Sequence, residues 1–299
     1  MVSINPTLPK FDYYRPDTSK EAINFLKEHS KDACPFIGGT DCFIAMRDGK
    51  LKSRYLVDLK GLEGFDALTF DDKRGLSIGA AVNLNRLITS KYVQAHYAVI
   101  AAAAREVGSY QLRTRATLVG NLCNASPCGD TIAACLVYDG SVNVLGPDGE
   151  RKVKLVDFFT GLGKTVLEPG EIVQTVDLPL PPPGAQGAYY SIGRNALGDL
   201  AIAAVTILAF PQESAPSGYQ FRIALSAVAP TVIFAEKAQG IMMNELINTK
   251  TIEKSALEAM HACKPIDDIR SSAAYRREMT HTLTLRALRS VCEQLQIEL

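Results

Sequence analysis

The residues best suited to chemistry lie in two short segments made of glycine and small polar side chains. Residues 36–41 read Phe-Ile-Gly-Gly-Thr-Asp, and residues 117–130 form a longer stretch whose only charged side chain is Asp130. In such segments few side chains separate the backbone N–H groups from a ligand, and consecutive N–H groups form an anion-binding concavity. Neither segment contains lysine. We therefore expect both to close on one diphosphate, held by backbone donors and hydroxyl groups.

Other candidate sites lack part of their pattern. Lys164 and Thr165 follow Gly163 as in a P-loop, but Phe158 stands where the motif requires its first glycine. The sequence has no strand–GxGxxG–helix unit, so a Rossmann site is unsupported. The four histidines are far apart, whereas metal ligands come at paired short spacings, and no nucleophile elbow is present. We predict no catalytic residue and no metal site in this chain.

Three cysteines lie close together, at Cys123, Cys128 and Cys135. An iron–sulfur cluster needs four thiolates, and Cys135 falls in an expected helix. We interpret these cysteines as structural or incidental, because free cysteine often acts as a small hydrophobic residue. Glycine segments also have a simpler interpretation, since Gly-Gly-Thr and Gly-Asn commonly form turns that bind nothing.

Three stretches of the sequence together resemble one known family. Residues 37–41 (IGGTD) and 111–130 (QLRTRATLVGNLCNASPCGD) resemble the two diphosphate-binding loops of the FAD-binding (medium) subunit of molybdenum hydroxylases. That family includes xanthine dehydrogenase and carbon monoxide dehydrogenase. Residues 158–181 resemble the segment that follows, and the resemblance runs in order through nearly the whole chain.

The resemblance implies a set of cofactor-binding residues. The diphosphate would lie against two groups of residues, namely Pro35, Phe36, Ile37, Gly38, Gly39, Thr40, Asp41 and Cys42, and Thr117, Leu118, Val119, Gly120 and Asn121. Asp130 matches an acidic residue near the ribose and adenine, and Val107 and Val173 match positions that flank the flavin. Two positions depart from the family pattern. Val119 replaces a glycine, which is costly if the backbone needs a positive φ. Ser191 replaces a lysine, a change expected to shift the redox poise of the flavin.

The function implied by the resemblance is that of an oxidoreductase subunit in electron transfer. FAD would be bound non-covalently, a large subunit would carry the molybdenum cofactor, and a small subunit would carry two [2Fe–2S] clusters. Electrons would pass from the clusters through FAD to NAD or another acceptor, in a dimer of heterotrimers. The alternatives are a self-contained FAD-dependent oxidase or reductase of the same binding architecture, and an assembly module that has lost FAD.

The composition agrees with an ordinary globular protein. The chain has 299 residues, of which 47% are hydrophobic, and Lys+Arg and Asp+Glu number 32 each. This balance gives no reason to expect a nucleic acid or an anionic membrane as partner. The longest apolar run, residues 200–210, is too short to span a bilayer, and no secretory signal begins the chain. With an odd count of seven cysteines, we expect a cytoplasmic protein without a disulfide framework.

The elements that position these residues predict an α+β fold in two parts. The resemblance makes residues 1–178 a two-lobed FAD-binding region of the vanillyl-alcohol-oxidase type and residues 188–299 a smaller C-terminal α+β domain. The proline-rich stretch 179–187 separates them. Expected helices follow Thr18 and Cys42 and cover 85–104, 131–140, 232–243, 252–263 and 273–299. Expected strands cover 54–59, 76–80, a hairpin over 141–159, and 171–180, with β-rich segments at 189–210 and 219–229.

Overall fold

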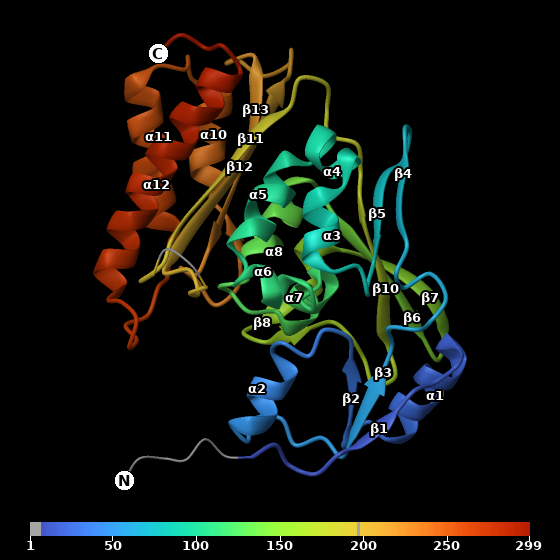
Figure 1. Cartoon of the computed structure of the whole chain (residues 1–299). Coiled ribbons are helices and arrows are strands. Elements are labelled where there is room, and N and C mark those ends of the chain that lie inside the picture. The colour runs from blue at the N-terminus through green and yellow to red at the C-terminus, as the bar shows by residue number, and fades with distance from the viewer. Residues whose placement is uncertain (1–6, 196–197) are drawn as a thin grey trace.

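The computed structural model describes residues 7–195 and 198–299, arranged as three sheets with helices packed between and outside them (Figure 1). The predicted FAD-binding region begins at residue 1, and its first six residues lie outside the described part of the chain, as do residues 196–197 of the predicted β-rich segment. The prediction of an α+β fold is confirmed. The remaining two strands pair as a separate hairpin.

The first lobe is a small parallel sheet in the order β1-β3-β2, flanked by two helices. Its elements are β1 (Asp12–Tyr14), α1 (Ser19–Glu28), β2 (Ala33–Phe36), α2 (Cys42–Arg47) and β3 (Tyr55–Asp58). The expected cap of α1 is present, because the Glu21 N–H donates to Thr18 Oγ1 at 3.2 Å. The Glu21 carboxylate accepts from the N–H of Asp17, one residue earlier than in a capping box.

The second lobe is a five-stranded antiparallel sheet in the order β4-β5-β10-β6-β7. Its strands are β4 (Leu68–Asp71), β5 (Gly75–Gly79), β6 (Ser141–Gly146), β7 (Gly149–Lys154) and β10 (Ile172–Leu178). The predicted hairpin over 141–159 is present as β6–β7, with its turn at residues 147–148, but it ends at Lys154 because the next four residues form a helix. A separate hairpin, β8 (Phe159–Gly161) and β9 (Lys164–Thr165), follows the short helix α9 (Leu155–Phe158). Lys164 thus opens a strand, whereas a P-loop would open a helix there.

A layer of short helices connects this lobe to the rest of the molecule. They are α3 (Leu84–Thr89), α4 (Lys91–His96), α5 (Ala98–Glu106), α6 (Tyr110–Arg113), α7 (Leu118–Asn124) and α8 (Asp130–Val137). The prediction of one continuous helix over 85–104 is wrong, because the chain leaves helical geometry at Ser90 and at Tyr97. Tyr97 is fully buried, and its hydroxyl donates to the carbonyls of Leu178 and Pro179, each at 3.1 Å. These contacts with distant residues stabilise the break in the helix, which helix propensity alone does not predict.

The C-terminal part is a four-stranded antiparallel sheet in the order β11-β12-β13-β14. Helices α10, α11 and α12 cover one face of it, and α5 and α8 pack on its other side (Figure 1). Its elements are β11 (Gln186–Ile192), β12 (Ala203–Pro211), β13 (Tyr219–Ser226), β14 (Ile233–Phe234), α10 (Glu236–Asn244), α11 (Thr249–Ala262) and α12 (Ala273–Gln294).

Three details of this part correct the expectations. The predicted helix over 232–243 begins only at Glu236, because Ile233 and Phe234 pair with β13 as an edge strand. The last helix ends at Gln294 instead of running to residue 299. At the start of α12 the aromatic Tyr275 is 43% exposed, whereas the charged Arg276 is 2% exposed, which is the reverse of what their residue types suggest. Arg276 is buried because its guanidinium donates to the Ile202 and Ala227 carbonyls.

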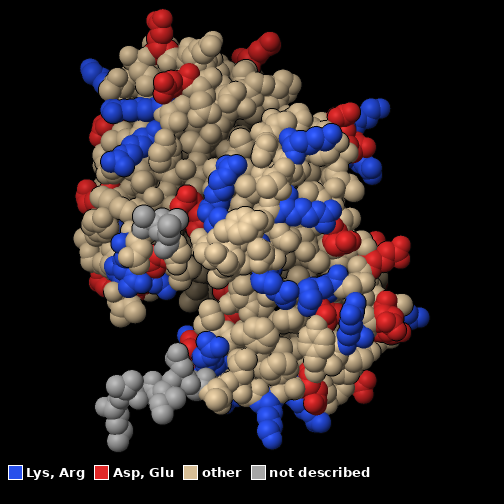
Figure 2. All heavy atoms as spheres, in the orientation of Figure 1, with Lys and Arg blue, Asp and Glu red and all other residues tan. Residues whose placement is uncertain are grey.

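The described surface mixes charges of both signs. Figure 2 shows Lys and Arg side chains interspersed with Asp and Glu side chains on one face of the molecule. No helix within the described residues is long and apolar enough to cross a bilayer.

Candidate functional site

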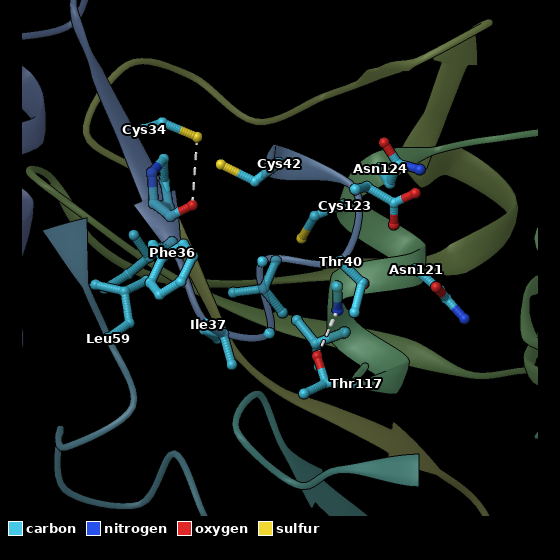
Figure 3. Close-up of a pocket in the computed structure, with 18 of the residues that line it drawn as sticks. Cys34, Phe36, Ile37, Thr40, Cys42, Leu59, Thr117, Asn121, Cys123 and Asn124 are labelled. Carbon is cyan, nitrogen blue, oxygen red and sulfur yellow. Dashed lines mark hydrogen bonds between the residues drawn. The ribbon is translucent and has the colours of Figure 1, made fainter. Parts of the chain in front are cut away.

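One cavity, of about 450 Å³, lies where the first lobe meets helix α7 and strand β10. Both glycine-containing segments contribute to its wall, and Figure 3 draws Ile37 and Thr40 of the first segment together with Thr117 and Asn121 of the second. Ligand cavities in proteins commonly have volumes of a few hundred Å³. From the predicted set, the lining includes Pro35, Phe36, Ile37, Gly38, Gly39, Thr40, Asp41, Cys42, Thr117, Val119, Gly120, Asn121 and Val173.

The first segment, between β2 and α2, lies against residues 115–116, which directly precede the second segment, and Gly38 makes this close approach possible. A Cβ atom on Gly38 would lie 2.4 Å from the carbonyl oxygen of Arg115, which is closer than real atoms approach. Gly39 has a φ of +77°, in the left-handed region that favours glycine. Among the described residues, the N–H groups of residues 38–41 have no hydrogen-bond acceptor. The turn therefore offers consecutive backbone donors on a segment pressed against residues 115–116.

The second segment is a helix start, and its prediction as a loop is wrong. Thr117 is the N-cap of α7, and its Oγ1 accepts from the Gly120 N–H at 2.9 Å. Leu118 and Leu122 are fully buried, and their packing holds the helix in place. Val119 is helical and is absent from the described non-glycine residues with positive φ. Valine at this position therefore causes no backbone strain.

The electrostatics of the cavity come from its backbone and from two carboxylates. Neither lysine nor arginine occurs among its described lining residues. Burial raises the pKa of Asp41. Arg151 forms a two-pronged ion pair with Glu171, with distances of 2.6 and 2.7 Å, and this hydrogen bonding lowers the pKa of the Glu171 carboxyl. The Glu171 charge is thus compensated within the protein, and the cavity presents mainly N–H groups and apolar side chains.

Comparison with known families decides what kind of site this is. Residues 9–181 match the family model described as the FAD binding domain in molybdopterin dehydrogenase. Residues 188–291 match the model described as the CO dehydrogenase flavoprotein C-terminal domain. The chain belongs to the FAD-binding (medium) subunits of the molybdenum hydroxylase family. Its predicted family, fold and oxidoreductase class are thereby confirmed.

Individual relatives of this FAD-binding subunit agree along its whole length. It is 28% identical to the carbon monoxide dehydrogenase medium chain of Afipia carboxidovorans, over 93% of this chain and 95% of that one. It is also 28% identical to a putative xanthine dehydrogenase FAD-binding subunit of Escherichia coli K12, over 92% and 94%. A solved carbon monoxide dehydrogenase from Hydrogenophaga pseudoflava, which lacks the Mo-pyranopterin moiety of the molybdenum cofactor, superposes with a TM-score of 0.91. It is 27% identical and covers 96% of this chain and 99% of that one.

The residues of the cavity fit the diphosphate of FAD. A diphosphate needs several donors at close range, and the open N–H groups of residues 38–41 supply them. A Cβ atom on Gly38 would clash with the Arg115 carbonyl and one on Gly39 with the Phe36 ring, so neither position accepts a larger residue without movement of the turn. No lysine or arginine lines the cavity within the described residues, and the binding of a diphosphate by backbone donors and hydroxyl groups stays a prediction.

Four of the predicted site residues lie away from the cavity lining. Leu118 is fully buried in the core. Val107, Asp130 and Ser191 lie instead where α5, α8 and β11 meet. There the Tyr189 hydroxyl donates to Asp130 Oδ1 at 2.6 Å. Burial raises the pKa of Asp130 to about 6. This FAD-binding subunit thus has a second polar site, around Tyr189. The sequence predicts its residues one by one and carries no signal that they lie together.

The cavity also includes residues that sequence reasoning missed, namely Cys34, Ala45, Leu51, Leu59, Cys123, Asn124, Leu167, Glu171 and Ile172. Cys123 and Asn124 lie four residues after Val119 and Gly120, so the helical period would have found them once residues 118–124 were recognised as a helix. Leu59 follows β3, the parallel neighbour of β2, and the ends of parallel neighbours meet at one edge. For the other missed residues, the sequence carries no comparable signal.

Replacing Thr117 with alanine is expected to lower the free energy of unfolding of the FAD-free chain by about 1 kcal/mol. The change removes the hydroxyl that accepts from the Gly120 N–H and leaves that donor without its cap. Urea denaturation measures the difference, with Thr117→Ser as the matched control that keeps the hydroxyl. Equal destabilisation by both substitutions would contradict the capping role.

Proposed function

We propose that this subunit binds FAD non-covalently, with the diphosphate between the first glycine segment and the start of α7. The observation that carries the proposal is that two segments widely separated in sequence line one cavity. In this proposal, residues 1–178 form the FAD-binding part and residues 188–299 the C-terminal part. The flavin ring extends toward the second part, past Val107, Val173 and Ser191, and Asp130 accepts from hydroxyl groups of the cofactor.

The protein's own contribution is binding and positioning. The N–H groups of residues 38–41 donate to the diphosphate, and the cap formed by Thr117 keeps α7 in place behind it. Apolar side chains such as Ile37, Leu59 and Val119 exclude water from the cavity wall, which strengthens those hydrogen bonds. When bound, FAD supplies the electron-transfer chemistry, taking electrons from [2Fe–2S] clusters of a small subunit and delivering them to NAD or another acceptor.

The same proposal includes partner subunits. A large subunit with the molybdenum cofactor oxidises the substrate, and a small subunit carries two [2Fe–2S] clusters, in a dimer of heterotrimers. The named relatives support this arrangement, because they are called medium chains and FAD-binding subunits of dehydrogenases. We place the complex in the cytoplasm, because all seven cysteines are free and a reducing compartment keeps thiols in that state.

Purification of the full chain from the cells that encode it tests this function. The expected result is a yellow complex with two further chains, molybdenum and iron, from which acid releases intact FAD. A chain that purifies alone with FAD and turns over a substrate by itself would instead support the self-contained oxidase or reductase. A colourless chain that takes up no FAD would support the assembly module.

A further inference from the structure

Two cysteines bracket the first glycine segment and face each other across it. Cys34 lies in β2 and Cys42 is the first residue of α2, so only the turn separates them. Both line the cavity and both are partly exposed. In Figure 3 the two sulfur atoms point toward one another. Nothing in the binding of a diphosphate by backbone donors requires thiols at these positions.

The surroundings make the two thiols chemically unequal. The interaction between them raises the pKa of Cys34 and lowers that of Cys42. The Cys34 thiol also donates to the Pro35 carbonyl at 3.4 Å, and the Cys42 sulfur lies 3.9 Å from Met46 Sδ. Because the thiolate is the reactive form of cysteine, the lowered pKa favours Cys42 over Cys34 as the nucleophile of the pair.

The same cavity contains a cysteine that serves as an internal comparison. Cys123 also lines the wall, and it is exposed whereas Cys42 is half-buried. Faster oxidation of Cys42 than of the more exposed Cys123 would therefore report the pairing of Cys42 with Cys34 and not easier access of the peroxide.

We propose that Cys34 and Cys42 are a redox-active pair that forms a reversible disulfide, with a hydroperoxide as the oxidant. The Cys42 thiolate attacks one peroxide oxygen, the O–O bond breaks, and the departing oxygen leaves as water or an alcohol after gaining a proton. The sulfenic acid formed on Cys42 is then attacked by the Cys34 sulfur. That S–O bond breaks, a second oxygen leaves as water, and the Cys34 proton is released to it. The two sulfur atoms lose two electrons in total, and the peroxide gains them.

The disulfide closes the first glycine segment into a covalent ring that contains Gly38 and Gly39. Oxidation would therefore act on the turn that presents the open N–H groups of residues 38–41. The reaction itself needs only the two thiols and a peroxide, so it goes beyond the proposed function and does not depend on FAD being bound. Two external thiols, or one dithiol, reverse it: the first thiolate forms a mixed disulfide with one cysteine, and the second displaces that cysteine, so that both protein thiols are restored and the reductant leaves as a disulfide.

Peptide mapping of the full chain after exposure to hydrogen peroxide tests the pair. Residues 32–47 contain both cysteines and no internal lysine or arginine, so trypsin releases them as one peptide after Lys31 and Arg47. After peroxide and then iodoacetamide, we expect this peptide to carry no alkyl group and to be lighter by two hydrogens, about 2 Da. Dithiothreitol should restore both alkylation sites, while Cys123 remains alkylatable throughout.

Single variants separate the pair from general oxidation. In Cys34→Ser the disulfide has no partner, so a sulfenic acid should accumulate on Cys42 and be trapped by dimedone. In Cys42→Ser the Cys34 thiol should stay free, and Cys123→Ser should behave like the wild type. We expect Cys42 to be oxidised on the order of tenfold faster than Cys123, or more. Equal rates, or a peptide 32–47 that stays doubly alkylated after peroxide, would overturn the proposal, and the wild-type result stands even if a variant does not fold.

Discussion

Replacing Gly38 with alanine is expected to weaken FAD binding by roughly tenfold or more. The new Cβ would lie 2.4 Å from the Arg115 carbonyl oxygen, and a backbone atom cannot swing aside as a flexible side chain can. The turn must move away from residues 115–116, which costs about 1–3 kcal/mol. The movement also displaces the N–H groups of residues 38–41 from the start of α7. Fluorescence titration of the FAD-free chain with FAD measures the loss.

The matched control for this substitution is Gly161→Ala. A Cβ atom at Gly161 meets nothing within 4 Å, and that residue lies outside the cavity lining. Its FAD affinity should equal that of the wild type. If Gly38→Ala also bound FAD with unchanged affinity, the close contact of Gly38 with Arg115 would have no part in the binding.

Replacing Asp130 with asparagine is expected to stabilise the FAD-free chain above about pH 6, by roughly 2–3 kcal/mol. Burial raises the pKa of the Asp130 carboxyl in the folded chain from 3.8 to about 6. Between those values the folded state binds more protons than the unfolded state, so the wild type loses stability as pH rises. Below pH 4 the carboxyl is protonated in both states, and the difference from asparagine disappears. An asparagine oxygen still accepts from the Tyr189 hydroxyl.

Chemical denaturation at a series of pH values between 4 and 8 measures this effect. The difference in unfolding free energy between Asp130→Asn and the wild type should grow from near zero to its full value across that window. Asp72→Asn is the matched control, because Asp72 is exposed in the turn between β4 and β5. If the difference in unfolding free energy between Asp130→Asn and the wild type did not change with pH, burial of the Asp130 carboxylate would not destabilise the folded chain.

A carboxylate retained in such surroundings is typical of a functional position. Tyr189 holds Asp130 at the junction of α8 with the C-terminal sheet, and Ser191 is two residues further along the same strand. The resemblance assigned Asp130 and Ser191 to the cofactor separately. The structure shows that Tyr189 donates to Asp130 and lies on the same strand as Ser191. No local pattern in the sequence identifies this tyrosine.

How much the sequence foretells depends on how local the deciding interactions are. The cap at Thr18 and the turn of the β6–β7 hairpin are encoded within a few residues, and both are present, although the hairpin ends at Lys154 and not at residue 159. The break at Tyr97 depends on the carbonyls of Leu178 and Pro179, which lie far along the chain, so local propensity misses it. Arg276 shows the same effect, because its burial depends on distant carbonyls in the sheet.

The cavity residues are likewise predictable only where the signal is local. Glycine and threonine at residues 38–40 are such a signal, and the sequence alone predicts that they line the site. The helical start of α7 was missed because Thr117 and Gly120 are equally typical of a turn, and only the buried Leu118 and Leu122 decide between the two. That error also concealed Cys123 and Asn124, which share the face of the helix that lines the cavity.

A crystal structure of the full chain with FAD bound tests the central claim most directly. The account predicts diphosphate oxygens within hydrogen-bonding distance of backbone N–H groups from residues 38–42, with α7 forming the opposite wall and no lysine or arginine in contact. A diphosphate located elsewhere, or one that touches only one of these two segments, would contradict it.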